Sequence, residues 1–333
     1  MPPRYVPLSI LLNQSHLPDK NLNSIITQKE NILIPKQLMS KDTDPTQVAP
    51  QNGFNIDKMY DDVMTIGPCK NICQMRLVVN TFKALTPIYC LALMTYFQNF
   101  STATVVYTGL HGSYGIIWLL KDIITPDETF KKPVSFFGSI SVSVCLAAYW
   151  YPFYVLASDS AALKCSEISL ERLLVAMIMF NVGVFMMVAT DVQKTVSLEY
   201  MKQIPNSPKT ITTAYFKHSR SLNYLGEVLV YTSYVVIPGD TQLYLTYFAI
   251  MFCTMLIGFV KKELSYRRKP EWTWYKEDTL SFLPRIFSGN GSELREQIGS
   301  TGHALFNYAL WYLVFVGGYK LYNAGGIFSI LKS

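Results

Sequence analysis

Beyond about residue 60, the chain alternates long apolar stretches with shorter polar ones. Several apolar stretches hold almost no charge over about 20 residues, which is enough helix to cross a bilayer core of roughly 30 Å. Because lipid offers the backbone no hydrogen-bond partner, helices are favoured over strands. The pattern predicts seven candidate spans, at about residues 77–99, 100–124, 134–158, 170–190, 224–237, 243–260 and 303–328.

The composition supports a membrane protein. Half of the residues (50%) are hydrophobic and only 16% are charged, whereas soluble proteins carry roughly 25% charged residues. The predicted fold is an all-α polytopic bundle of about seven transmembrane helices, and a very hydrophobic soluble core is the alternative. We divide the chain into a polar N-terminal extension (1–60), a membrane bundle (61–285) and a linker with an additional C-terminal helix (286–333).

The basic residues are unevenly distributed along a chain with a net charge of +6. Most of them lie in two polar stretches, at residues 194–220 and 261–295, with two candidate spans between them. Both stretches should therefore face the same side, which the positive-inside rule identifies as the cytoplasmic or matrix side. Acidic residues mixed into the second stretch argue against nucleic acid as a partner.

The cysteines indicate neither a disulfide framework nor a metal site. Three of the six cysteines lie within candidate spans, where cysteine behaves as a small apolar residue. Cys69 and Cys73 are four residues apart, but no second Cys/His pair accompanies them. A zinc site normally needs four such ligands, so we predict no metal.

The polar residues with the greatest chemical interest lie between residues 191 and 227. Asn223 and Glu227 are four apart, so both project from one face of a helix that enters the membrane. A carboxylate at the edge of a bilayer is costly and by default marks a site. Asp191 lies at the matching end of an earlier span. We expect these side chains to form a polar pocket that opens to the basic side; the alternative is that Asn223 and Glu227 only cap a helix.

The motif Arg220-x-x-Asn223-Tyr224-Leu225-Gly226-Glu227 resembles the signature of the steroid 5-alpha-reductase C-terminal domain and its relatives. The resemblance covers roughly residues 105–284. Further matching elements are His111-Gly112-Ser113-Tyr114-Gly115 with Trp118 and Lys121-Asp122, then Asp191-x-Gln193-Lys194, and finally Arg268-Lys269-Pro270-Glu271-Trp272 with Tyr275-Lys276 and Leu283-Pro284.

This resemblance implies a reductase that uses NADPH to reduce an activated carbon–carbon double bond of a lipid. His111 or Tyr114 would supply a proton to the substrate carbonyl. The cofactor-binding residues implied by the resemblance are Asp191, Lys209, Arg220, Asn223, Tyr224, Glu227, Tyr266 and Arg268. Among these, Asn223 and Glu227 would hold the nicotinamide end, and Lys209 and Arg220 would contact the phosphates.

The sequence also departs from that family. Leu222 replaces the usual proline, and residues 194–209 lack the arginine-rich and glycine-rich pattern of the reductases. A second hypothesis is therefore an accessory structural subunit of a large membrane complex, such as a mitochondrial respiratory-chain complex. Its N-terminal extension and last helix would contact other membrane subunits. A third hypothesis is an isoprenylcysteine-type methyltransferase. Either the mitochondrial inner membrane or the endoplasmic reticulum would suit the chain.

Overall fold

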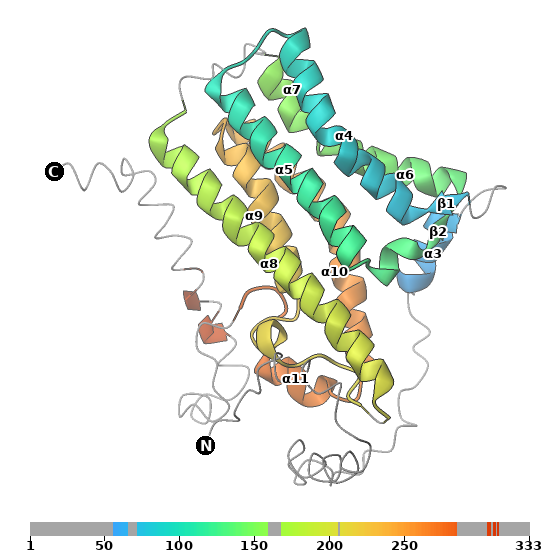
Figure 1. The fold of residues 1–333 in the computed structure, drawn as a ribbon. Helices are drawn as coiled ribbons and strands as arrows, with labels where there is room; N and C mark the ends of the chain where they lie inside the picture. Colours follow the sequence, from blue (N-terminus) through green and yellow to red (C-terminus); the bar gives the residue numbers. More distant parts are fainter. Residues whose placement is uncertain are drawn as a thin grey trace, which may run out of the picture. The chain divides into compact units, whose positions relative to one another are not determined.

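The computed structural model describes residues 56–65, 72–158, 168–205 and 207–284, together with 305–307, 309, 310 and 312. Most of the N-terminal extension and nearly all of the seventh predicted span (303–328) lie outside the described residues. The described part confirms a mostly helical fold (Figure 1).

Nine α-helices carry the described structure. They are α3 (Ile56–Thr65), α4 (Met75–Tyr96), α5 (Thr102–Ile124), α6 (Phe136–Ala148), α7 (Tyr151–Ala157), α8 (Leu170–Gln203), α9 (Leu222–Val236), α10 (Thr241–Arg267) and α11 (Trp272–Asp278). Two 3-10 helices, η3 (Glu128–Lys131) and η4 (Ala214–Lys217), lie in the connections. The antiparallel strands β1 (Cys73–Gln74) and β2 (Pro133–Val134) join the starts of α4 and α6.

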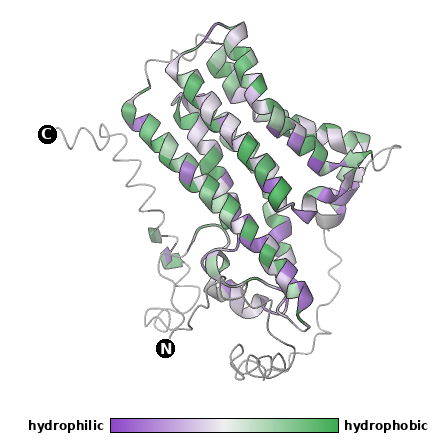
Figure 2. Cartoon of the chain, in the orientation of Figure 1, coloured by the Kyte–Doolittle hydropathy of each residue, from purple (hydrophilic) through white to green (hydrophobic). Residues whose placement is uncertain are grey.

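Four segments of the described chain are long and apolar enough to cross a membrane. They are α4, the α6–α7 segment Phe136–Ala157, α8, and Gln242–Arg267 of α10. They expose large apolar side chains, for example Leu77, Ile88 and Leu91 of α4, and hydrophobic residues make up much of the helices in Figure 2. These features agree with an integral membrane protein in a lipid bilayer.

Two of the other predicted spans are helices that are not both long and apolar enough to be counted among these four segments. Helix α9 has 15 residues, fewer than the roughly 20 needed to cross the bilayer core. Helix α5 has 23 residues, but polar and small residues such as His111 and Gly112 lower its hydropathy. Helix α5 contacts α4, α7, α8 and α9. Its polar residues His111, Lys121 and Asp122 are buried on that side, whereas apolar residues such as Ile116 are exposed on the other.

Several helices begin at a side-chain cap. Ser135 Oγ accepts a hydrogen bond from Gly138 N (3.1 Å) at the start of α6, and Asp240 Oδ1 accepts one from Leu243 N (2.9 Å) at the start of α10. Ser169 caps α8 in the same way (3.3 Å). Each cap satisfies one of the free N–H groups of a helix start, which explains why these helices begin where they do.

Helix α8 continues past residue 190, where the sequence pattern predicts its span to end. It has 34 residues, or about 51 Å at 1.5 Å per residue, which exceeds a bilayer core of roughly 30 Å. The additional turns contain good helix formers such as Gln193, Lys194 and Glu199. Its C-terminal part can therefore extend into the polar layer beside the membrane.

The third predicted span is two helices. Helix α6 ends at Ala148 and α7 starts at Tyr151, with Pro152 in its first turn. Proline lacks the N–H that a continuous helix would need. The Trp150 carbonyl at the break accepts a hydrogen bond from Tyr154 N (3.1 Å), and Tyr89 Oη lies 3.4 Å from it. An interrupted helix at membrane depth requires such partners.

The most extensive helix contact is between α8 and α9, and it depends on two glycines. A Cβ atom placed on Gly226 would lie 2.6 Å from Gly183 O and 2.7 Å from Met187 N. A Cβ atom on Gly183 would lie 2.7 Å from Gly226 O. Small residues allow helix backbones in membranes to approach this closely. The pair therefore sets the separation of α8 and α9.

The two basic stretches lie together, as the charge pattern predicts. Arg220 pairs with Glu263, and Ser219 forms a parallel bridge with Leu280. Lys209 N donates a hydrogen bond to Glu271 Oε1 (2.9 Å). Since these contacts join residues of both stretches directly, the two stretches occupy the same end of the bundle, near α11 in Figure 1.

We predict that Gly226→Ala destabilises the protein by about 1–3 kcal/mol, the usual range for an overpacked contact. The new methyl group would force α8 and α9 apart at their closest approach. Thermal unfolding in detergent measures the effect as a lower Tm. Gly109→Ala on α5 is the matched control, because its Cβ atom would meet nothing within 4 Å. Equal Tm values for the two variants would contradict the close crossing.

Candidate functional site

Charged side chains from five helices converge inside the bundle. They are Lys83 of α4, Lys121 of α5, Asp191 of α8, Glu227 of α9 and Lys262 of α10. The Glu227 carboxylate interacts favourably with all three ammonium groups and unfavourably with Asp191. Unpaired charges are expensive in an apolar interior, so this set, which we call the charge layer, must be held together by mutual attraction.

The first pair of the charge layer joins α5 to α8. Lys121 Nζ forms an ion pair with Asp191 Oδ2, and both side chains are buried, with relative exposures of 4% and 12%. Lys121 Nζ also lies 4.3 Å from the Trp118 ring centroid, within cation–π distance. Asp191 thus takes part in the predicted polar site, but its charge is already paired with a lysine of the same chain.

Asp122, the neighbour of Lys121, takes a different partner. Arg76 Nε donates to Asp122 Oδ2 at 2.5 Å, and Asn80 Nδ2 donates to the same oxygen at 2.7 Å. Both donors belong to α4. Lys121 and Asp122 therefore do not form a pair with each other at the surface; they tie α5 to two different helices.

Asn223 and Glu227 lie one turn apart on α9, as their spacing predicts. Asn223 Oδ1 accepts a hydrogen bond from Lys262 Nζ (2.9 Å). Among the described residues, nothing donates a hydrogen bond to the Glu227 carboxylate. Tyr224, between them, packs against α10, where a Cβ atom on Gly258 would lie 2.7 Å from Tyr224 Oη. Glu227 is therefore the member of the motif that keeps its hydrogen-bonding capacity for a ligand.

Arg220, a predicted phosphate contact, has all three guanidinium nitrogens engaged. Nε and Nη2 donate to the two carboxylate oxygens of Glu263 at 2.9 and 3.0 Å. Nη1 donates to Thr279 O (2.7 Å) and Thr279 Oγ1 (2.9 Å). Tyr266 Oη lies 3.4 Å from Arg220 O, within reach of a hydrogen bond. Arg220 and Tyr266 thus join the two polar segments at the end of the bundle.

The remaining two predicted basic contacts lie at the surface. Lys209 and Arg268 are both exposed. Lys209 contributes its backbone N–H to Glu271 Oε1, and Thr210 Oγ1 donates to Oε2 of the same carboxylate (3.0 Å). The structure therefore separates these two residues from the charge layer.

The predicted proton donors are on the buried face of α5. The His111 ring stacks on Tyr234 with a centroid distance of 4.6 Å, and Tyr114 Oη lies 3.4 Å from Met187 Sδ, close enough to donate to it. Within the described residues, His111 Nδ1 and Tyr234 Oη are buried without a hydrogen-bond partner. Buried polar atoms rarely lack a hydrogen-bond partner, so the space around His111 is of functional interest.

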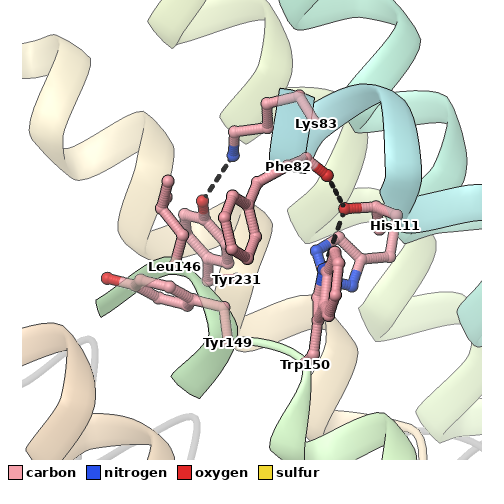
Figure 3. Close-up of a pocket in the computed structure, with 8 residues that line it drawn as sticks. Phe82, Lys83, His111, Leu146, Tyr149, Trp150 and Tyr231 are labelled. Carbon is pink, nitrogen blue, oxygen red and sulfur yellow. Dashed lines mark hydrogen bonds between the residues drawn. The ribbon is translucent and has the colours of Figure 1, made fainter. Parts of the chain in front are cut away.

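That space contains two residues that the motifs did not identify, Lys83 and Tyr231. Lys83 Nζ donates a hydrogen bond to Tyr231 Oη (2.8 Å) and lies 4.3 Å from the Tyr114 ring centroid. Figure 3 shows Lys83, Tyr231 and His111 around one small pocket. The sequence could have indicated Lys83 by its position. It is a charged residue inside the first predicted span, and such residues usually mark a site.

The structure thus sorts the predicted site residues into groups. Asp191 and Glu227 belong to the charge layer, and Asn223 contacts its member Lys262. His111 and Tyr114 lie next to the charge layer. Its member Lys83, which interacts with Glu227, contacts the Tyr114 ring and lines the same small pocket as His111. In the described part of the chain, no group of three or more His, Cys, Asp or Glu side chains is placed to hold a metal ion.

Asp127, in the connection between α5 and α6, forms a further contact with Lys194 in the C-terminal part of α8. Lys194 Nζ donates to Asp127 Oδ2 (2.8 Å), and Thr129 N donates to Oδ1 (2.8 Å). Burial raises the pKa of Asp127, but Lys194 and these hydrogen bonds outweigh burial and lower it from 3.8 to about 2. The ionised carboxylate is therefore favoured by folding.

A comparison with known protein families gives a match. The profile of a family described only as a protein of unknown function (DUF1295) matches residues 127–279. The matched region includes Asp191, Asn223, Glu227 and Lys262. It does not include His111 or Lys83, which lie before its start. No curated protein matches the chain.

We predict that Asp127→Asn lowers the free energy of unfolding by about 1–2 kcal/mol at neutral pH, allowing for partial exposure. Because the pKa of Asp127 is lower in the folded protein, its contribution is present above about pH 4. It is lost as the pH falls towards about 2. Denaturation at several pH values should show wild type and variant converging in acid. Glu128→Gln, at an exposed neighbour, is the control; a pH-independent difference for Asp127→Asn would contradict the ion pair.

Proposed function

We propose that the chain is a steroid 5-alpha-reductase-like membrane protein that reduces a carbon–carbon double bond of a lipid with NADPH. The observation that carries this proposal is the meeting of Asn223 and Glu227, one turn apart on α9, with lysines from α4, α5 and α10 inside an apolar bundle. A carboxylate in such a position is costly, and Glu227 keeps its hydrogen-bonding capacity.

The side chains of α9 suit the nicotinamide end of the cofactor. A carboxamide has an NH₂ group that donates and an oxygen that accepts. The Glu227 carboxylate can accept from the NH₂ group, and the Asn223 amide nitrogen can donate to the oxygen, because only Asn223 Oδ1 is used by Lys262. When bound, the cofactor would supply the hydride for the reduction.

The phosphates need basic groups other than Arg220, whose nitrogens are engaged with Glu263 and Thr279. Lys262 donates one hydrogen bond to Asn223, and Lys194 donates one to Asp127, so each ammonium group has further N–H donors to offer. We assign the phosphate contacts to these two side chains. Ammonium groups suit this purpose because they attract phosphate as point charges.

A specific observation also supports the second candidate, an accessory structural subunit without the reaction. Asp191 is paired with Lys121, and Arg220 is fully engaged by Glu263 and Thr279. Two residues that the family resemblance assigns to the cofactor thus stabilise the bundle itself. A former enzyme that kept its fold would retain such pairs, because breaking a buried pair is strongly destabilising.

We predict that Glu227→Gln weakens NADPH binding by about 1–3 kcal/mol, through loss of a charge-assisted hydrogen bond. Calorimetry on purified protein measures this difference directly. Glu199→Gln, at an exposed position of α8, is the matched control and should bind like wild type. If wild-type protein binds no dinucleotide at millimolar ligand, the reductase proposal fails and the subunit proposal gains.

For the subunit proposal, we predict that removing residues 1–55 leaves the helix bundle folded but releases it from its complex. The deleted segment precedes α3, whose contacts with α6 and α10 belong to the bundle. Co-purification in mild detergent measures the association, and the Tm of the truncated protein checks the fold. A native protein that runs as a monomer, or a truncated one that still co-purifies fully, would remove the support for this candidate.

A further inference from the structure

Helix α8 carries an exposed amide near the middle of an apolar span. Asn181 follows the helix start at Leu170 by about three turns, which is roughly 17 Å at 1.5 Å per residue. The hydrocarbon core of a bilayer is roughly 30 Å thick, so Asn181 lies near its midplane. Its side chain is exposed, and α8 runs along one side of the described bundle (Figure 1). Lipid or another helix must therefore cover this amide.

The hydrogen-bonding capacity of Asn181 is only partly used. An amide has two N–H donors and an oxygen that accepts. Asn181 Nδ2 donates a hydrogen bond to Met177 O (2.8 Å), and within the described structure this is its single hydrogen bond. Lipid cannot bind the remaining N–H and oxygen. The exposed Thr81 and Thr95 of α4 differ, because each uses its one hydroxyl donor on a carbonyl of its own helix.

Asn181 lies in the centre of an apolar stripe. The stripe consists of Leu174, Ile178, Asn181 and Phe185, which follow one another in steps of four, three and four residues. This is the spacing of the contact positions of paired helices. The three apolar members are 45%, 54% and 60% exposed. An apolar stripe alone would suit lipid, whereas a single asparagine within such a stripe specifies the register and number of paired helices.

A second copy of the chain matches this stripe. Two copies in one membrane have the same topology, so their α8 helices run parallel to each other. A two-fold axis along the membrane normal brings the same patch of each copy together, with both Asn181 side chains at the same depth. The amide is complementary to itself, because the unused N–H of one copy can donate to the oxygen of the other. This one contact therefore satisfies both unused groups.

We propose that the chain forms a parallel homodimer through α8, in which the stripe packs against its counterpart and the two Asn181 amides are hydrogen-bonded to each other. Asparagine side chains form such bonds between helices in membranes. The dimer leaves the crossing of α8 and α9 intact. Gly183 faces α9, and residues two apart project to nearly opposite sides of a helix. The proposal goes beyond the proposed function and needs neither cofactor nor substrate.

The test measures self-association of the full-length chain in phosphatidylcholine liposomes. Copies labelled at the C-terminus with a donor or an acceptor fluorophore are mixed, and energy transfer is followed as the lipid-to-protein ratio is raised. Asn181→Leu removes the amide and keeps a side chain of similar size. Thr81→Leu is the matched control, because it also exchanges an exposed polar side chain for leucine, but on α4. The Tm of each variant in detergent checks that the bundle is folded.

We expect the wild-type chain to give energy transfer that falls on dilution with lipid, because a dimer in equilibrium with its monomer depends on concentration. Asn181→Leu should weaken the dimer by about tenfold, through loss of the hydrogen bonds between helices. Thr81→Leu should associate like wild type, and Asn181→Gln should keep most of the affinity because it keeps the amide. A wild-type monomer at every ratio, or equal association of wild type and a folded Asn181→Leu, would overturn the proposal.

Oxidative cross-linking identifies the face that mediates association. Ile178→Cys on the stripe should give a disulfide-linked dimer above the level of the parent chain. Phe248→Cys, at an exposed position of α10, should not. A cross-link from Ile178→Cys to a different protein, or to a cysteine placed within residues 303–328 of the same chain, without a dimer product would identify another occupant of the stripe. Either result would contradict the homodimer.

Two further samples separate the dimer from the candidate functions. Self-association should persist in Glu227→Gln and in the chain that lacks residues 1–55, because the stripe includes neither. A dimer in protein that binds no NADPH would retain the homodimer and remove the reductase. Loss of the dimer on removal of residues 1–55 would assign the interface to that extension and remove the α8 homodimer.

Discussion

The close crossing of α8 and α9 at Gly183 and Gly226 is the constraint on which the site depends. Each glycine lies where a Cβ atom would meet the backbone of the other helix. The crossing places Glu227, directly after Gly226, within electrostatic reach of Asp191, two turns beyond Gly183 on α8. A larger residue at either glycine would separate these helices and change the spacing of Glu227 and Asp191 within the charge layer.

The charge layer shows how an apolar bundle holds ionised groups. Lys121 forms a direct pair with Asp191 and joins α5 to α8, and Lys262 is held by the Asn223 amide and joins α10 to α9. These contacts therefore also specify which helices are neighbours. Outside the charge layer, Arg220 pairs with Glu263 of α10. Removing one member would leave its partner buried and uncompensated, which costs more than the pair contributes. This explains how the residues of a candidate site can also be necessary for the fold.

Two environments meet in the inner part of the bundle. The Glu227 side contains the charges of Asp191, Lys121 and Lys262, whereas the Lys83 side borders a small pocket lined by aromatic side chains such as Tyr149 and Trp150. Lys83 and Glu227 interact with each other, so they connect the two environments.

Much of the fold followed from the sequence alone. Runs of apolar residues predicted α4, α8 and α10 because a helix in lipid must be apolar over its whole length. The i,i+4 spacing of Asn223 and Glu227 predicted their shared face on α9 because helix geometry is local. The positions of the basic residues predicted that the stretches around Arg220 and Glu263 lie at the same end.

The partners of those residues were decided by the tertiary structure. Nothing local to Arg220 indicates that Glu263 and Thr279 would engage its guanidinium, and nothing near Asp191 indicates Lys121. The break between α6 and α7 was hidden within one apolar run, and the importance of Lys83 was visible only as a charge inside a span. Hydropathy and periodicity depend on neighbours in sequence, whereas ion pairs and pockets depend on distances between helices, which only packing determines.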